Sequence, residues 1–84
     1  MTSKEIRDIL KTWLIPALTA LGGSAHYLDV YKNIWSHHKY DISNNGDMFF
    51  YRWQYELSHA AAKLRKEGVM EKDAVLPKGV WALK

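Results

Sequence analysis

The last third of the chain constrains the fold more than any other part of the sequence. A segment with helical periodicity, Met48–Glu67, ends at Gly68 and is followed by two short apolar stretches, Val69–Glu71 and Gly79–Leu83. The residues between these stretches include two lysines and a proline, a composition typical of a turn. This end of the chain is therefore predicted to form a helix that leads into a β-hairpin with a basic tip.

Two further helices are predicted before this segment. The first helix, about Ser3–Leu21, carries an apolar stripe at helical spacing. Ser3 is its expected N-cap, and the glycine pair that follows Leu21 ends it. Pro16 interrupts this stripe and is expected to kink the helix. The second helix covers about Tyr27–His38. The turn-forming residues of Lys39–Asp47 then predict a loop, whose last residue caps the third helix.

This order of elements indicates an α+β fold, a winged helix-turn-helix with three helices and a C-terminal β-hairpin as the wing. Ser24–His26, between the first two helices, can add a short third strand to the wing. Residues 1–84 are expected to form a single domain, because a chain this short cannot divide into two separately stable cores. Trp81 is expected to be buried against the third helix.

Composition excludes several classes of protein. The chain contains no cysteine, so disulfides and thiolate metal sites are ruled out. No apolar run approaches the ~20 residues needed to span a bilayer, and Glu5 and Asp8 interrupt the layout of a signal peptide. We therefore expect a cytoplasmic protein without a membrane partner.

The net charge of +3 is distributed unevenly. Basic and acidic residues are equal in number over residues 1–47, so the whole excess lies in residues 48–84, in the predicted third helix and wing. Cations gathered in this way are typical of a surface that replaces counterions around nucleic-acid phosphates, although a charge of this size is also ordinary for a small domain.

The third helix has two different faces. The apolar face, expected to pack on the core, consists of Phe50, Trp53, Leu57, Ala60, Ala61 and Leu64. The opposite face carries the candidate DNA-binding residues Tyr51, Arg52, Tyr55, His59 and Lys66. Arginine can bind guanine through two hydrogen bonds, and tyrosine hydroxyls commonly contact phosphate. The alternatives are that the tyrosines only cover the helix surface and that Arg52 pairs with Glu56, four residues on.

Outside this helix, four polar residues are candidates for contacts to the DNA backbone. Lys72 and Lys78 lie in the predicted wing and can neutralise phosphates, or they can simply be solvated. Asn44 and Asn45 lie in the predicted loop and can either reach the backbone or serve the turn itself. Double-stranded DNA is thus the expected partner.

Four segments occur in a characteristic order and spacing: Ile15–Leu18, Leu21–Ala25, Leu64–Val69 and Lys78–Leu83. Through these segments the chain resembles the N-terminal winged-helix domain of Mrr-type restriction systems. The resemblance covers most of the chain and implies DNA binding. His59 departs from the family pattern, in which tryptophan is frequent. In restriction enzymes a nuclease domain follows this module, whereas here the sequence ends just after the wing, so the resemblance does not imply cleavage.

No catalytic residues, metal ligands or cofactor are predicted, and we expect that the protein is not an enzyme. The only plausible general bases are four histidines, and no paired carboxylates lie beside a lysine as nuclease chemistry would need. His37 and His38 are adjacent and point to different helix faces, which disfavours a shared metal. No glycine-rich phosphate-binding motif is present.

The competing function is that of a protein-interaction module, because winged helices also serve for dimerisation or docking. Four apolar residues are in surplus on the first two helices and predict a homodimer interface: Ile15, Leu18, Leu28 and Trp35. Homodimerisation fits both functions, since helix-turn-helix proteins often pair to read two half-sites. The sequence predicts either a small transcription regulator or DNA-targeting accessory factor, or a docking module that does not bind DNA.

Overall fold

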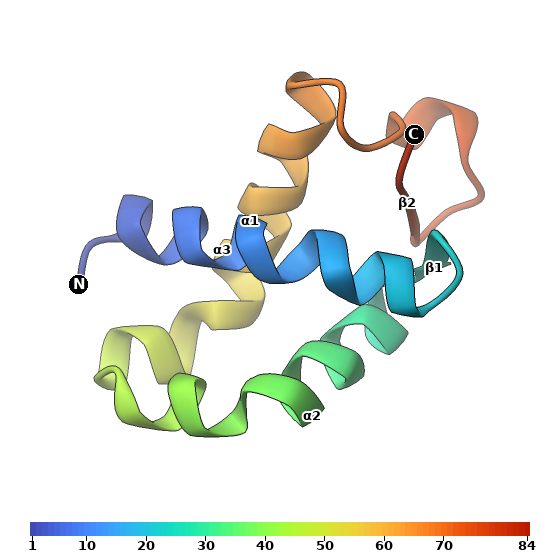
Figure 1. Cartoon of the computed structure of the whole chain (residues 1–84). Helices are drawn as coiled ribbons and strands as arrows, with labels where there is room; N and C mark the ends of the chain where they lie inside the picture. Colours follow the sequence, from blue (N-terminus) through green and yellow to red (C-terminus); the bar gives the residue numbers. More distant parts are fainter.

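The computed structural model describes all 84 residues and shows three helices packed beside a small antiparallel sheet (Figure 1). The helices are α1 (Ser3–Ala20), α2 (Tyr27–Asn44) and α3 (Asp47–Lys66). The strands are β1 (Ser24–His26) and β2 (Val80–Ala82), and a short 3-10 helix, η1 (Asp73–Val75), precedes β2. The fold is α+β and has the form of a winged helix with a C-terminal wing, residues 69–84.

α1 begins at Ser3, which was expected to be the capping residue before the helix. Thr2, not Ser3, is the N-cap: its hydroxyl accepts a hydrogen bond from the Glu5 backbone N–H at 3.2 Å. The Glu5 carboxylate accepts one from the Thr2 backbone N–H at 2.9 Å in return. Thr2 rather than Ser3 is the cap because only Thr2 has a glutamate three residues further on, and this glutamate completes a capping box. The helix continues through the exposed Pro16 and ends at Ala20.

The loop predicted for Lys39–Asp47 is wrong over most of its length, because α2 continues to Asn44. His38 leaves helical geometry (φ −129°, ψ 22°), so the helix breaks there and then resumes. The resumed part is held by Ile42, which is fully buried among otherwise polar neighbours. The connection shrinks to two residues, and Gly46 caps α3 in the place predicted for Asp47.

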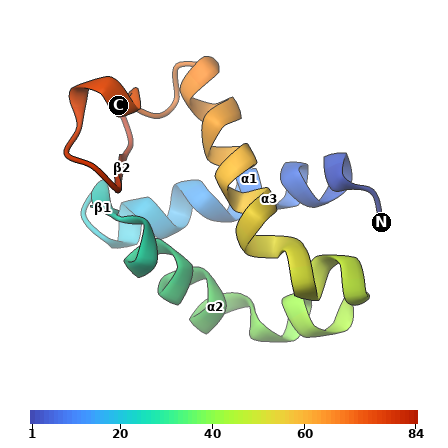
Figure 2. The same ribbon diagram turned by 180° about the vertical axis from the view of Figure 1, so that it is seen from behind.

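The core lies where α1 crosses α3, with α2 closing it from below in the view of Figure 1 (Figures 1 and 2). The members that come from the three helices include Ile6, Leu10, Leu14, Leu18, Ile34, Ile42, Phe49, Trp53, Leu57 and Leu64. Leu18 has no exposed surface. Its assignment to a dimer interface is therefore wrong. None of the three helices combines the length and apolar character needed to cross a membrane.

The apolar face of α3 differs from the prediction at its first turn. Phe49 is fully buried and packs against Trp13 of α1, with ring centroids 5.6 Å apart. Phe50 projects toward α2 and is 40% exposed. Phe49 therefore takes the buried position against α1, and Phe50 lies at the exposed edge of the apolar face, on the side of α2.

The sheet also differs from a simple hairpin. β1 pairs with β2 in antiparallel register, with Ala25 opposite Trp81. The first arm of the predicted hairpin joins the other edge of β2 through a single bridge, Met70 to Leu83. What was expected as an optional third strand is therefore the regular partner of β2. The wing is tied by β1 to the helical core.

Trp81 is buried, as expected, and only 7% of it is exposed. Its ring packs against both α2 and α3: Tyr31 of α2 lies edge-on with a centroid separation of 6.1 Å, and Arg65 of α3 lies over the ring at 5.6 Å. This one side chain therefore joins the wing to both helices of the helix-turn-helix.

Candidate nucleic-acid interface

α3 presents one face to solvent along its length, because its opposite face is buried against α1 and α2. All the predicted DNA-binding residues of this helix are exposed: Tyr51, Arg52, Tyr55, His59 and Lys66. They share one side of the helix, since a spacing of three or four residues returns to the same face. Seen from behind, α3 lies in front of α1 with the wing to one side (Figure 2). The structure thus brings these five side chains onto one accessible surface.

Arg52 is held from two sides. Its Nε lies 3.8 Å from Oε2 of Glu56, and its guanidinium carbon lies 4.7 Å from the centre of the Tyr55 ring. The Arg52 side chain is 47% exposed, whereas that of Glu56 has no exposed surface. The pair is therefore not the surface ion pair considered from the sequence, because one of its members is fully buried.

Glu56 also joins α3 to α1. Arg7 donates a hydrogen bond from its Nε to Oε1 of Glu56 at 2.9 Å. Burial alone would raise the pKa of the Glu56 carboxyl, but the nearby Ser3 hydroxyl, the hydrogen bond from Arg7 and the charges of Arg7 and Arg52 together lower it below its ordinary value. Glu56 is therefore a buried carboxylate held in its charged form. Sequence reasoning missed its burial because Arg7 is 49 residues away.

The second half of the exposed face is aromatic and basic. The Tyr55 and His59 rings meet edge to face, with centroids 4.7 Å apart. Lys66 is exposed and forms no ion pair. Lys63 has the same properties but was not among the predicted residues, because it lies at the flank of the face. Its charge in the last turns of α3 is the signal that could have identified it.

The wing, residues 69–84, also carries free cations. Lys72 and Lys78 are both exposed, and neither forms an ion pair. The base of the wing is fixed, because Gly79 accepts a hydrogen bond from the backbone N–H of Tyr27 at 2.9 Å. Gly79 has φ +81°, and an added Cβ would lie 2.8 Å from Nε2 of His26. Only glycine fits at this junction without displacing the histidine.

Arg65 fixes the tip of the wing, a role that the sequence did not suggest. Its side chain is 14% exposed, lies over Trp81, and places Nη2 3.2 Å from the Asp73 carboxylate in η1. Arg65 therefore has an acidic partner within the protein itself, Asp73. Of the basic residues in α3 and the wing, the lysines rather than the two arginines are therefore free of internal partners.

Asn44 and Asn45 are exposed, but their amides are already engaged. The Asn44 amide donates to the carbonyl oxygen of Tyr40 at 2.8 Å, and the Asn45 amide donates to that of Asp41 at 2.6 Å. Both side chains thereby stabilise the end of α2. These contacts favour the turn-forming alternative for both residues over a contact to the DNA backbone.

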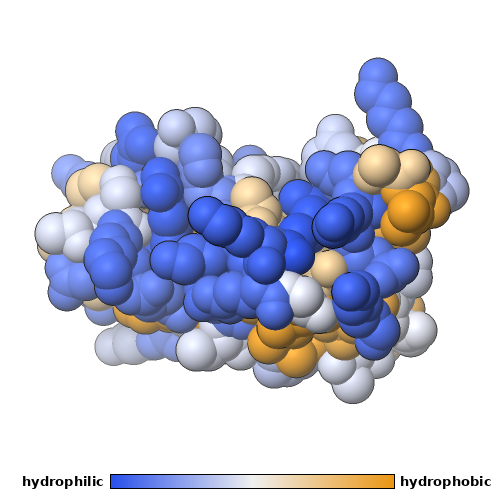
Figure 3. All heavy atoms as spheres, turned by 90° about the horizontal axis from the view of Figure 1, so that it is seen from above, coloured by the Kyte–Doolittle hydropathy of each residue, from blue (hydrophilic) through white to orange (hydrophobic).

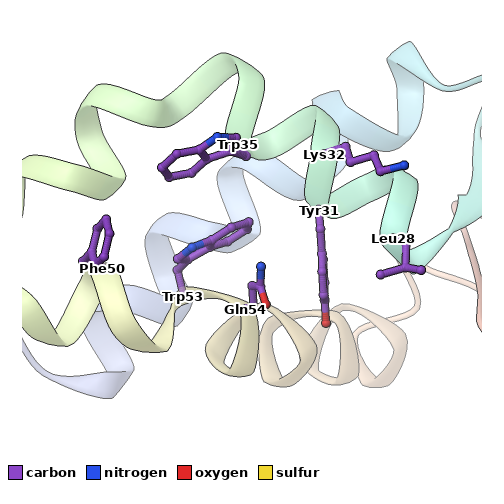
Figure 4. Close-up of a pocket in the computed structure, with 7 residues that line it drawn as sticks. All are labelled: Leu28, Tyr31, Lys32, Trp35, Phe50, Trp53 and Gln54. Carbon is purple, nitrogen blue, oxygen red and sulfur yellow. The ribbon is translucent and has the colours of Figure 1, made fainter.

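A second surface feature, the α2–α3 groove, lies between the two helices (Figure 4). It has a volume of about 450 Å³ and is lined by Leu28, Tyr31, Lys32, Trp35, Phe50, Trp53 and Gln54. Two predicted interface residues, Leu28 and Trp35, both line this groove and are 49% and 37% exposed. Ile15 lies elsewhere, in a depression beside Leu64 and Val69 of the opposite flank. The four predicted dimer residues therefore do not form one surface.

The end of the molecule at which α3 terminates is mostly hydrophilic, with small apolar patches toward its edges (Figure 3). The chain matches no protein-family model, no curated protein and no solved structure. A proposal about its function therefore depends on the geometry described above.

Proposed function

We propose that this protein binds double-stranded DNA, as a small transcription regulator or DNA-targeting accessory factor. α3 enters the major groove and the wing rests on the neighbouring backbone. The observation that carries the proposal is the set of exposed lysines without internal partners beside the open face of α3: Lys63, Lys66, Lys72 and Lys78. Free cations of this kind gain most from replacing the counterions of DNA.

The side chains divide into two roles. Arg52 is the candidate for reading a base edge, because a half-exposed guanidinium at the start of α3 can reach guanine O6 and N7 together. Tyr51 and Tyr55 offer hydroxyls to phosphates, and Lys72 and Lys78 offer charge at the wing. The first role gives discrimination between sequences, and the second gives affinity for any duplex.

Fluorescence anisotropy with a labelled random duplex at low salt tests the proposal. Binding in the micromolar range or tighter, weakening as salt is added, is the expected result. No binding at tens of micromolar protein would overturn it. With a site selected from random sequences, Arg52→Ala should lose ~1–3 kcal/mol of discrimination and leave random-duplex affinity nearly unchanged.

A second function, self-association, is favoured by the α2–α3 groove. Three partly exposed apolar side chains, Trp35, Phe50 and Leu28, line this groove together, and contiguous apolar surface can mark an interface. Sedimentation velocity at about 100 μM without DNA should then show dimer. Trp35→Lys should abolish it, while Tyr40→Lys, an exposed site on α2 outside the groove, should not. Monomer alone in the unmodified protein would remove this second function.

A further inference from the structure

Glu56 is the one charged or polar residue that is buried in this protein. Its two carboxylate oxygens face different arginines. Oε1 accepts the hydrogen bond from Arg7 at 2.9 Å, while Oε2 is buried without a hydrogen-bond partner and has Nε of Arg52 3.8 Å away. A buried carboxylate oxygen left uncompensated is costly, and Arg52 is the cation placed to compensate it.

We propose that Glu56 is a positioning residue that holds Arg52 in the orientation needed to read a base. The inference rests on the proposed DNA-binding function and adds a specificity-determining residue to it. Glu56 cannot touch DNA itself, because it has no exposed surface. It acts only through Arg52.

The physical basis is preorganisation. A free arginine on a helix surface samples many rotamers, and fixing them at the moment of binding costs conformational entropy. Here Glu56 attracts the Nε edge of Arg52, and the Tyr55 ring lies 4.7 Å from its guanidinium carbon. A guanidinium has five N–H donors, four of them on its two terminal nitrogens, and the ion pair with Glu56 approaches Arg52 only from the Nε side. A bidentate contact to guanine requires two of these.

The competing explanation is that Glu56 only ties α3 to α1 through Arg7. Arg7→Met provides the matched control, because it breaks this tie and leaves Glu56 beside Arg52. Glu56→Gln retains the volume and an acceptor for Arg7 but removes the charge that attracts Arg52. The two variants therefore separate helix packing from the positioning of Arg52.

The test is a double-mutant cycle between Glu56 and Arg52, read as the ratio of dissociation constants for a selected duplex and a random duplex. Glu56→Gln should lower this ratio at least about threefold when Arg52 is present and have no effect in an Arg52→Ala background. Arg7→Met should lower the thermal midpoint and change the ratio less than about twofold. If Arg7→Met lowers the ratio as much as Glu56→Gln, or if the effect of Glu56→Gln persists without Arg52, the positioning role is overturned.

The outcomes also separate this inference from the proposed function. If Arg52→Ala lowers discrimination and Glu56→Gln does not, only the positioning role fails. If the protein binds no DNA, or if Arg52→Ala leaves discrimination unchanged, base reading by Arg52 fails and the positioning role fails with it.

A measurement on the unmodified protein covers the case in which Glu56→Gln does not fold. Only Arg7, Arg52 and Arg65 contribute arginine Nε signals. NMR relaxation should show the Nε of the half-exposed Arg52 to be about as rigid as an ordered backbone, with an order parameter of about 0.85, and a value below about 0.6 would contradict the inference.

Discussion

Replacing Trp81 by alanine should remove the contact that joins the wing to the helices. Trp81 is 7% exposed and lies in β2, opposite Ala25 of β1. Tyr31 of α2 and Arg65 of α3 both pack against its ring. No neighbouring large side chain is free to fill the space, because those contacts come from two helices that are themselves fixed in the core.

The expected cost follows from these contacts. Truncating a buried tryptophan to alanine costs ~3–5 kcal/mol, through lost transfer free energy and the cavity that remains. Arg65 adds to this, because it loses a cation–π contact worth about 0.5–1 kcal/mol or more. In a domain of this length, 1 kcal/mol lowers the thermal midpoint by ~4–8 °C, so a loss of about 4 kcal/mol should lower it by ~15–30 °C.

Thermal unfolding followed by circular dichroism measures this shift. Val75→Ala is the matched control, because Val75 lies in the same wing and is 66% exposed. Its effect should stay within about 0.5 kcal/mol. If Trp81→Ala shifts the midpoint no more than Val75→Ala does, then the wing is not packed on the helices as described.

Two further predictions concern pH and backbone strain. His38 stacks on Trp13 with ring centroids 3.9 Å apart. Burial lowers the pKa of His38 below 6.5; the charge of His37 lowers this pKa further, and the charge of Asp41 only partly offsets the decrease. Since the unfolded chain then takes up a proton first, stability should fall as the pH drops from 6.5 toward the folded pKa. Thermal midpoints between pH 7.5 and 5 should show this loss, and an equal loss in His38→Gln would refute it. Gly79→Ala should destabilise the protein more than Gly68→Ala, although both glycines have φ +81°, because only Gly79 has a side chain in the way. Equal denaturation midpoints for these two variants would show that the contact with the His26 ring adds no strain.

The sequence predicts those parts of this fold that depend on local signals. Gly68 predicts the end of α3 at Glu67, within one residue of the observed end at Lys66. The buried and exposed faces of α3 follow from helical spacing. The sequence allows an optional third strand at Ser24–His26, which the structure contains as β1, and it predicts the burial of Trp81, which is confirmed. These features need only propensity, periodicity and the size of an aromatic side chain.

Features set by distant neighbours were not predictable. The continued part of α2 contains one core residue, Ile42, whose burial cannot be inferred from its polar neighbours in the sequence. Leu18 and Leu28 look alike in the sequence, yet one is fully buried and the other is 49% exposed. The burial of Glu56 required Arg7, which no local pattern connects to α3. For the candidate site, the sequence identified the exposed face of α3 but not the internal partners of Arg52 and Arg65.

The salt dependence of DNA binding tests the central proposal most directly. The logarithm of the observed binding constant for a random duplex is measured against the logarithm of salt concentration for the unmodified protein, Lys78→Ala and Lys39→Ala. Lys78 lies in the wing, whereas Lys39, which is also exposed and unpaired, lies on α2. Removing one phosphate contact should make the slope shallower by about one unit for Lys78→Ala and leave it unchanged for Lys39→Ala. Absence of binding, or equal slopes for the two variants, would contradict a DNA interface formed by α3 and the wing.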